Sequence, residues 1–310
     1  MILILSDERD LSTTQVIEWL EFLNRKWIRI NQEDKVKIEF CGKEIIFKLN
    51  NIVFNFSDVT SFWYRRGYIN LQNDTTGIRP FDEFQNEELK IIMQFIYYKL
   101  DDKHHLNSIK NANVNKLIVT SMARDCNINT PEDYIFSNKE GLEQVINSKN
   151  TYITKSISGD SIREFEDFIA FNYTSEFTND WLIPDSFSPS LVQNQIIKKY
   201  ELRIFYLAGE FYTMAIFSQK DNQTSVDFRN YNNHKPNRRV PYKLPLEIEE
   251  KLDVLMKKMD LNSGSIDMIV TPENEYVFLE INPVGQFGMT SFPCNYNIEK
   301  RIADYLSYEN

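Results

Sequence analysis

The chain has 310 residues, of which 42% are hydrophobic and 14% aromatic, and its formal net charge is −10. This length and composition predict a folded globular protein of two or three domains. The acidic balance argues against a general nucleic-acid binder, because such proteins gain affinity by neutralising phosphates. The first residues lack a basic lead-in, and no run approaches the ~20 apolar residues of a membrane span. We therefore expect a cytoplasmic protein without a membrane segment.

The first third of the chain predicts an α/β unit. A strand at 2–5 precedes a helix at 12–25, whose apolar side chains recur at helical spacing. Alternating runs at 36–40 and 44–47 indicate a hairpin. A further apolar run ends in Trp63-Tyr64-Arg65-Arg66. Two arginines after a buried strand could bind an acidic ligand or cap an interdomain surface, and the pattern does not decide between them.

A helix at 83–100 and a polar stretch at 101–111 suggest a first domain boundary. Beyond it, a strand, a helix and a second strand are expected at 134–136, 139–147 and 152–155. Lys155 ends the second of these strands and runs into Ser156-Ile157-Ser158-Gly159, a loop suited to backbone N–H contacts with phosphate. The glycine-rich P-loop and dinucleotide fingerprints are both absent from the sequence.

Residues 160–190 are polar and aromatic, which is compatible with core packing or with a groove for a partner peptide. From residue 191 the pattern favours antiparallel strands at 192–197, 200–207 and 211–217, followed by a helix at 246–260. Arg203 lies inside one of these strands. It is either a surface residue with a buried stem or part of a site.

Two apolar runs near the C-terminus, 265–270 and 276–283, flank a turn and predict a hairpin. Alternation places Glu280 and Asn282 on one face, and symmetric pairing places Asp267 opposite Glu280. Two carboxylates about 4 Å apart repel by roughly 4 kcal/mol at an effective dielectric near 20, which a shared proton or a divalent cation would relieve. These oxygen donors suit Mg²⁺ better than Zn²⁺. The alternative is a hairpin edge with solvated acids.

The order of these features along the chain resembles the ATP-grasp superfamily over residues 110–285. The features that carry the resemblance are Lys116, Thr130-Pro131, Lys155, Gln195-Ile196-Ile197, Glu201-Leu202-Arg203, Asp227-Phe228-Arg229-Asn230, Asp267 and Glu280-Ile281-Asn282-Pro283. The segment Trp63 to Arg66 and the first seven residues look like the graspetide synthetases, which macrocyclise ribosomal peptides. Within that group the chain resembles the grasp-with-spasm and microviridin-type maturases.

The resemblance implies a mixed α/β and α+β architecture, the ATP-grasp fold. It would comprise an N-terminal α/β pre-ATP-grasp domain (1–105), a central α/β module (106–190) with the leader-peptide site, and a C-terminal antiparallel-sheet domain (191–310) with the Mg-ATP site. It also implies residue roles. Lys116 and Lys155 would hold the phosphates of ATP, the backbone at Gln195 and Ile197 would meet adenine, and Glu201 would reach the ribose. Asp267, Glu280 and Asn282 would bind one or two Mg²⁺, with two expected, and Arg203 and Arg229 would stabilise the transferring phosphoryl group.

The implied activity is an ATP-dependent ligation. A side-chain carboxylate of a precursor peptide is activated as an acyl phosphate, and a Thr or Ser hydroxyl then gives an ω-ester or a Lys amine an amide, with release of ADP and phosphate. The expected partner is a ribosomal precursor with a leader and a core that contains Thr/Ser and Asp/Glu. A homodimer is expected, without nucleic-acid or membrane partners. The alternatives are an ATP-grasp ligase that appends an amino acid to a peptide or protein, and a nucleotide-binding regulator without turnover.

Overall fold

The computed structural model describes residues 1–73, 75–146, 150–158, 162–171, 174–177, 181–219 and 236–308. They form two compact units. Unit 1 consists of Met1–Asn113, Leu261–Ser263 and Pro283–Asn310, and unit 2 consists of Val114–Asp260 and Gly264–Asn282. The C-terminal helices therefore belong to the same unit as the N-terminal third, although the sequence grouped them with residues 191–310. The three-part division stays a prediction.

Unit 1 is built on a parallel sheet of β1 (Ile2–Ser6), β2 (Trp27–Asn31), β6 (Ser61–Tyr64) and β8 (His104–Leu106), in the order β2-β1-β6-β8. All five residues of the central strand β1 are buried, as a parallel strand covered on both faces requires. The predicted first strand and helix are confirmed, because α1 (Leu11–Phe22) follows β1. Helix α7 (Ile298–Leu306) packs against α1; α6 (Gly288–Cys294) precedes it.

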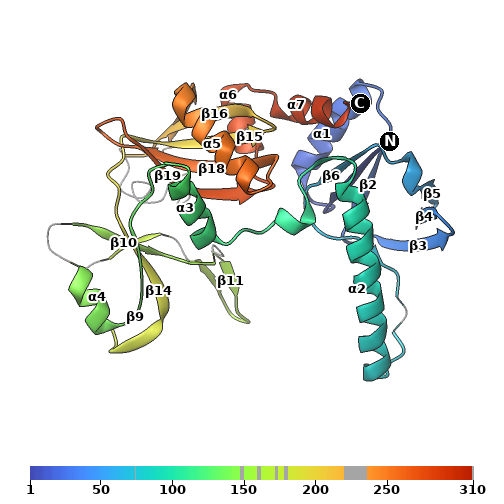
Figure 1. Cartoon of the computed structure of the whole chain (residues 1–310), viewed down its shortest axis with the longest axis horizontal. Coiled ribbons are helices and arrows are strands. Elements are labelled where there is room, and N and C mark those ends of the chain that lie inside the picture. The colour runs from blue at the N-terminus through green and yellow to red at the C-terminus, as the bar shows by residue number, and fades with distance from the viewer. Residues whose placement is uncertain are drawn as a thin grey trace. The chain divides into compact units, whose positions relative to one another are not determined.

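A second sheet of unit 1 has the order β5-β4-β3-β7, with β3 (Lys35–Cys41), β4 (Glu44–Leu49), β5 (Ile52–Asn55) and β7 (Asn70–Leu71). The predicted hairpin is confirmed as β3–β4, and Phe47 stacks on Phe54 with ring centroids 5.0 Å apart. One hydrophobic core joins this sheet, the parallel sheet and the long helix α2 (Arg79–Asp101). Figure 1 shows α2 extending away from the two sheets of this unit.

The chain turns at Gly67, directly after the paired arginines. This residue has φ +75°, and a Cβ there would lie 3.0 Å from the Ser6 carbonyl oxygen and from Cβ of Gln32. Both the backbone conformation and the close approach favour glycine at this position. The turn thereby keeps Arg65 and Arg66 at the carboxyl end of β6, beside the end of β1.

The first sheet of unit 2 has the order β13-β10-β14-β9, with β9 (Asp133–Asn138), β10 (Tyr152–Lys155), β13 (Ser175–Phe177) and β14 (Ser186–Asn194). Helix α4 (Lys139–Val145) contacts β9 and begins after Asn138, whose side chain accepts from the Gly141 N–H. A small hairpin pairs β11 (Ile162–Glu164) with β12 (Ile169–Phe171). The strand expected at 192–197 is wrong at its end, because β14 stops at Asn194 and residues 195–198 form a loop.

The second sheet of unit 2 has the order β17-β16-β15-β18-β19. Its strands are β15 (Tyr200–Leu207), β16 (Glu210–Phe217), β17 (Arg238–Tyr242), β18 (Ser263–Val270) and β19 (Tyr276–Pro283). Helices α3 (Lys116–Asp125) and α5 (Leu246–Lys258) contact each other beside it. The β18–β19 hairpin predicted from the sequence is present. Among the described residues, no helix combines the length and the apolar character needed to cross a bilayer.

Candidate nucleotide and metal site

Unit 2 contains a pocket between its two sheets that encloses about 850 Å³, part of it open to solvent. β10, β14, β15, β18 and β19 all contribute to its wall, together with the loop after β14. The lining residues are Pro131, Ile153, Lys155, Thr174, Gln193, Asn194, Gln195, Ile196, Lys198, Glu201, Leu202, Asp267, Met268, Ile269, Leu279 and Glu280.

The acidic residues of the hairpin lie in this pocket. β18 supplies Asp267 and its neighbour β19 supplies Glu280, and both side chains line the wall. The hairpin turn contains Asn274 in the left-handed region at φ 66°, which asparagine tolerates better than most residues. The amide of Asn282 donates to Glu280 Oε1 at 3.3 Å. The residue-by-residue register in which Asp267 faces Glu280 stays a prediction.

Lys116 forms an ion pair with Glu280, through Nζ and Oε2. It is the first residue of α3, and this helix begins there because Asn115 caps it. The Asn115 side chain accepts from the N–H groups of Leu117 and Ile118 at 3.0 and 3.3 Å. The N-cap at Asn115 therefore fixes the start of α3 and places the ammonium of Lys116 beside the carboxylate of Glu280.

The pKa of Glu280 is about 2. Burial alone would raise it, but the ammonium of Lys116, its hydrogen bond, the charge of Lys155 and the Asn282 amide together lower it. Glu280 is therefore a carboxylate throughout the neutral range.

Arg203 holds the second carboxylate. It extends from the central strand β15, and its Nη1 donates to Asp267 Oδ2 at 2.5 Å. The side chains of Arg203 and Asp267 are both largely buried. Arg203 is therefore not a solvated surface residue. The geometry supports the alternative interpretation, in which Arg203 belongs to the acidic site.

The structure contains a buried ion pair near Asp267, between Lys198 and Glu201, that the sequence did not predict. Glu201 Oε1 accepts from Lys198 Nζ at 2.5 Å and from Ser218 Oγ at 2.7 Å. Burial raises the pKa of Glu201 despite the opposing charge of Lys198, and nearby Asp267 raises it further. The only signal in the sequence was a lysine three residues before a strand glutamate.

The remaining residues that were predicted for the site differ in whether they line the pocket. Lys155 and Gln195 line the pocket. The Gln195 backbone N–H donates to Thr151 O at 2.9 Å, and its side chain donates to Glu176 at 2.9 Å. Ile197 is 74% exposed and lies outside the lining. Arg229 lies outside the described residues.

The donor set of this site fits Mg²⁺. Asp267 and Glu280 provide two carboxylates, and Asn282 adds an amide oxygen whose orientation is set by its hydrogen bond to Glu280. Mg²⁺ takes one or two protein carboxylates and completes its shell with water and substrate phosphates. Within the described ranges, no group of three or more His, Cys, Asp or Glu forms an all-protein metal cage. Two carboxylates and one amide oxygen fit a metal ion that completes its coordination shell with water and phosphate oxygens.

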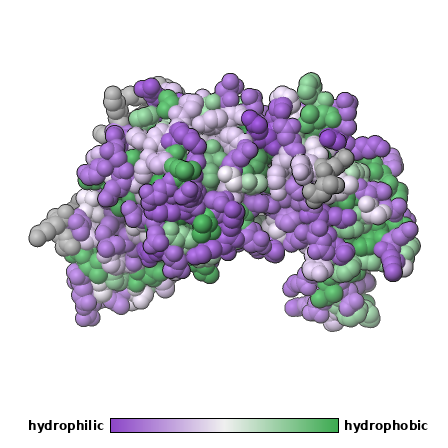
Figure 2. Space-filling view, turned by 45° about the horizontal axis from the view of Figure 1, so that its top comes forward, coloured by the Kyte–Doolittle hydropathy of each residue, from purple (hydrophilic) through white to green (hydrophobic). Residues whose placement is uncertain are grey.

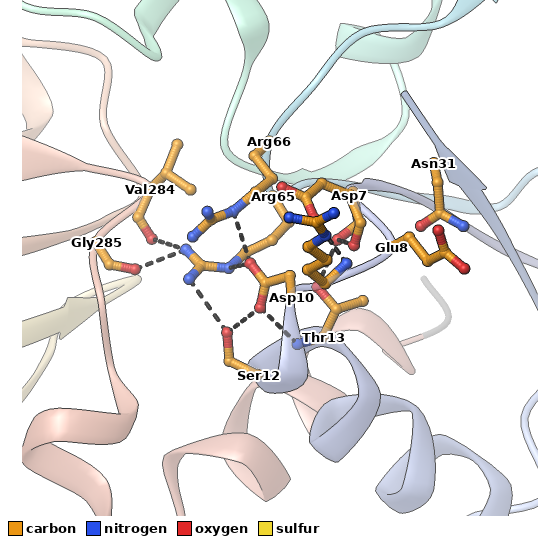
Figure 3. Close-up of polar contacts among 12 residues, drawn as sticks. Asp7, Glu8, Asp10, Ser12, Thr13, Asn31, Arg65, Arg66, Val284 and Gly285 are labelled. Atoms are coloured by element: carbon orange, nitrogen blue, oxygen red, sulfur yellow. Dashed lines mark hydrogen bonds and ion pairs between the residues drawn. The ribbon is translucent and has the colours of Figure 1, made fainter. Parts of the chain in front are cut away.

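The paired arginines of unit 1 have different surroundings (Figure 3). Arg65 is buried: Nε lies 3.1 Å from Asp10 Oδ2, Nη1 donates to the carbonyl oxygens of Val284 and Gly285 at 3.1 and 2.7 Å, and Nη2 donates to Ser12 Oγ at 3.2 Å. Arg66 is exposed, and its Nε lies 2.7 Å from the same Asp10 oxygen. Arg65 is thus a structural residue that joins β6 to α1 and to the chain before α6, and Arg66 alone is open to solvent.

Solved structures with the same fold were found, although no protein-family model and no curated protein matches the sequence. The macrocyclase MdnC of Microcystis aeruginosa, solved with precursor peptide MdnA, is 28% identical with a TM-score of 0.77, covering 98% of both chains. A RiPP-associated ATP-grasp ligase of Chryseobacterium gregarium, solved with ADP and a leader and core peptide, is 25% identical with a TM-score of 0.81, covering 98% of this chain and 96% of that one. The macrocyclase MdnB of M. aeruginosa is 22% identical with a TM-score of 0.76 over 99% of both chains.

Proposed function

From the ATP-grasp fold that this chain shares along its whole length with peptide macrocyclases and a RiPP-associated ATP-grasp ligase, we propose that it is an ATP-dependent peptide macrocyclase. Its substrate is a precursor peptide, as in the first of these structures, with a leader and a core, as in the second. It activates an Asp or Glu side chain of the core and closes an ω-ester ring with Thr or Ser, or an ω-amide ring with Lys.

One observation carries this proposal. The pocket of unit 2 is lined by three carboxylates, Glu201, Asp267 and Glu280, and by two lysines, Lys155 and Lys198. Lys116 from α3 and Arg203 from β15 form ion pairs with Glu280 and Asp267. Ionised oxygens and clustered cations in one pocket are what a metal–nucleotide complex requires.

The chemistry needs no nucleophilic side chain from the protein. A carboxylate oxygen of the peptide attacks the terminal phosphorus of ATP, the bond to the bridging oxygen breaks, and ADP leaves. A hydroxyl or amine of the same peptide then attacks the acyl carbon, phosphate leaves with the bonding electrons, and the attacking group loses its proton. Both steps depend on positioning and charge neutralisation, which Arg203 and the lysines of the pocket supply, with Arg229 in the same role.

The site residues divide by position. Asp267, Glu280 and Asn282 would hold one or two Mg²⁺, and the metal would neutralise phosphate charge. Lys116 and Lys155 lie beside these oxygens and would bind phosphates. Gln195 and its loop would contact adenine and Glu201 the ribose, at the end of the pocket where Lys198 lies.

A candidate groove for the leader peptide lies beside the β13-β10-β14-β9 sheet of unit 2. α4 and the segment around β13 form a hollow with an apolar floor. Trp181 in its wall is 43% exposed, and its ring centroid is 5.2 Å from that of Phe177. Phe165 and Phe168, stacked on the β11–β12 hairpin, are more than half exposed, so this aromatic segment is not simply core. The groove residues are Lys139, Leu142, Glu143, Ile146, Phe177, Trp181 and Ile183.

The test uses ATP, Mg²⁺ and a peptide encoded beside the gene of this chain. We expect peptide-dependent ADP formation and the loss of one water from the peptide for each ring. Asp267→Asn and Glu280→Gln should abolish both, while Glu273→Gln, an exposed carboxylate in the turn of the same hairpin, should leave both unchanged.

Undiminished turnover in Asp267→Asn and Glu280→Gln would refute the assignment of the metal ligands. A peptide that gains the mass of an amino acid would instead identify a ligase that appends a residue. Binding of ADP without peptide-dependent turnover would favour a nucleotide-binding regulator.

A further inference from the structure

Two carboxylates of the unit 2 pocket are each held by a cation of the same unit. Lys116 Nζ pairs with Glu280 Oε2, and Arg203 Nη1 donates to Asp267 Oδ2 at 2.5 Å. The four side chains are between 9 and 22% exposed, so water screens these pairs little. Ion pairs on the surface of unit 2, where Figure 2 shows many hydrophilic residues, are screened much more strongly. The chain itself therefore balances the charge of both carboxylates.

A divalent cation would compete with these two side chains for the same oxygens. Asp267 and Glu280 are the carboxylates whose chemistry fits Mg²⁺, and they are also the partners of Arg203 and Lys116. A metal ion on those oxygens would add positive charge beside an ammonium and a guanidinium, and like charges repel. Two carboxylates and two cations together leave no net charge to attract a metal. We therefore expect a metal ion alone to bind weakly at this site.

Both cations are placed so that they can turn toward an anion. Lys116 is the first residue of α3 and carries its charge on a flexible four-carbon stem. The Nε of Arg203 is buried and has no hydrogen-bond partner among the described residues. A guanidinium has five N–H donors, and a buried donor without an acceptor is unfavourable. The pair with Asp267 thus leaves part of this guanidinium unsatisfied, and phosphate oxygens are the acceptors that match it.

We propose that Lys116 and Arg203 keep Glu280 and Asp267 closed to a metal ion until the phosphates of a nucleotide draw the two cations away. The cations then change partners, from carboxylate to phosphate, and the carboxylates open to Mg²⁺. This inference rests on the nucleotide site of the proposed function. Its consequence is a positive coupling, in which nucleotide and metal each raise the affinity of the chain for the other by the same factor.

The first measurement is the affinity for Mn²⁺ alone, from electron paramagnetic resonance of the free ion, because Mn²⁺ prefers the same oxygen ligands as Mg²⁺. Lys116→Met and Arg203→Met each leave one carboxylate without its cation. Each should bind Mn²⁺ at least about tenfold more tightly than the parent chain, a coupling of ordinary size. Lys116→Arg keeps the charge and should bind Mn²⁺ as weakly as the parent. Lys251→Met, which breaks an ion pair with Glu247 on α5 of the same unit, is the matched control and should change nothing.

The second measurement is the calorimetric affinity for ADP in excess Mg²⁺. Lys116→Met should bind ADP at least about tenfold more weakly, because it lacks a charged donor for the phosphates. The two effects of this substitution therefore have opposite signs. A lysine that served only the ion pair would not weaken ADP binding, and one that served only phosphate would leave Mn²⁺ binding unchanged. The double variant Lys116→Met/Glu280→Gln should lose the gain in Mn²⁺ affinity, since the freed carboxylate is gone.

Circular dichroism checks that every variant is folded, and the substitutions on α3 and β15 test the proposal independently. Single variants that bind Mn²⁺ no more tightly than the parent chain would overturn it, as would a double variant that keeps the gain. Undiminished ADP binding by Lys116→Met would overturn the exchange of partners. Binding of Mg²⁺ and ADP as expected, without peptide-dependent turnover, would refute the macrocyclase function and leave this proposal standing.

Discussion

Arg65→Met should destabilise unit 1 more than any substitution of its neighbour Arg66. The side chains of Arg65 and Asp10 are each 3% exposed. The substitution also removes the donors from the buried carbonyl contacts of Val284 and Gly285. Breaking a buried ion pair by removal of one partner costs about 3–5 kcal/mol. Arg66 lies 44% exposed beside the same carboxylate, and Arg66→Met should cost about 0–1 kcal/mol, as for other solvent-screened pairs.

The assay exploits the positions of the tryptophans. Trp19, Trp27 and Trp63 are in unit 1 and Trp181 is in unit 2. In a Trp181→Phe background, fluorescence-detected urea unfolding therefore reports unit 1 alone, which avoids treating a chain of two units as a single two-state system. With a slope of about 2 kcal/mol per M, a loss of about 4 kcal/mol lowers the midpoint by about 2 M.

Arg65→Lys is the intermediate control. It keeps the charge but loses the planar fork that reaches Asp10, Ser12 and the two carbonyl groups together. We expect its stability to lie between that of the parent chain and that of Arg65→Met. A loss below about 1 kcal/mol for Arg65→Met, equal to that for Arg66→Met, would refute the structural role assigned to this arginine.

Two further predictions concern buried charges. Burial acts to raise the pKa of Asp10, but Arg65, Ser12, Arg66 and the Thr13 N–H outweigh it and lower that pKa in the folded chain. The ionised Asp10 carboxylate therefore contributes its full share to the free energy of unfolding above the unfolded pKa near 3.8, and this contribution is lost as the pH falls through the folded pKa. Urea unfolding of the parent chain and of Asp10→Asn measures the contribution as a difference in stability. This difference should be constant near pH 6 and should shrink below about pH 4. In unit 2, Lys198→Met leaves the Glu201 carboxylate buried without its ammonium and should cost about 3–5 kcal/mol. Adding Glu201→Gln to Lys198→Met should restore most of the lost stability. A double-mutant cycle measured by thermal unfolding tests this, and additive effects of the two substitutions would contradict the pairing of Lys198 with Glu201.

Local pattern was sufficient for several regular elements. The β3–β4 and β18–β19 hairpins and the start of α4 at Lys139 were predicted, because turn residues and alternation act within a few residues of the chain. The end of β14 was missed, since the apolar pair Ile196-Ile197 continues a strand pattern although Asn194 is the last strand residue. Helices α6 and α7 were not predicted at all.

The sequence by itself predicted a hairpin with Asp267 on one strand and with Glu280 and Asn282 on one face of the other. The order of these residues and of the lysines and arginines along the chain indicated the ATP-grasp resemblance. Only the tertiary structure decided which charge meets which. Lys116 pairs with Glu280 across 164 residues and Arg203 with Asp267 across 64, and no local pattern encodes distances of that kind. The same holds for the two arginines after β6, where the packing of β1, α1 and the chain before α6 buries Arg65 and leaves Arg66 in water. Burial sets the cost of an unpaired charge, and burial is a property of the folded chain.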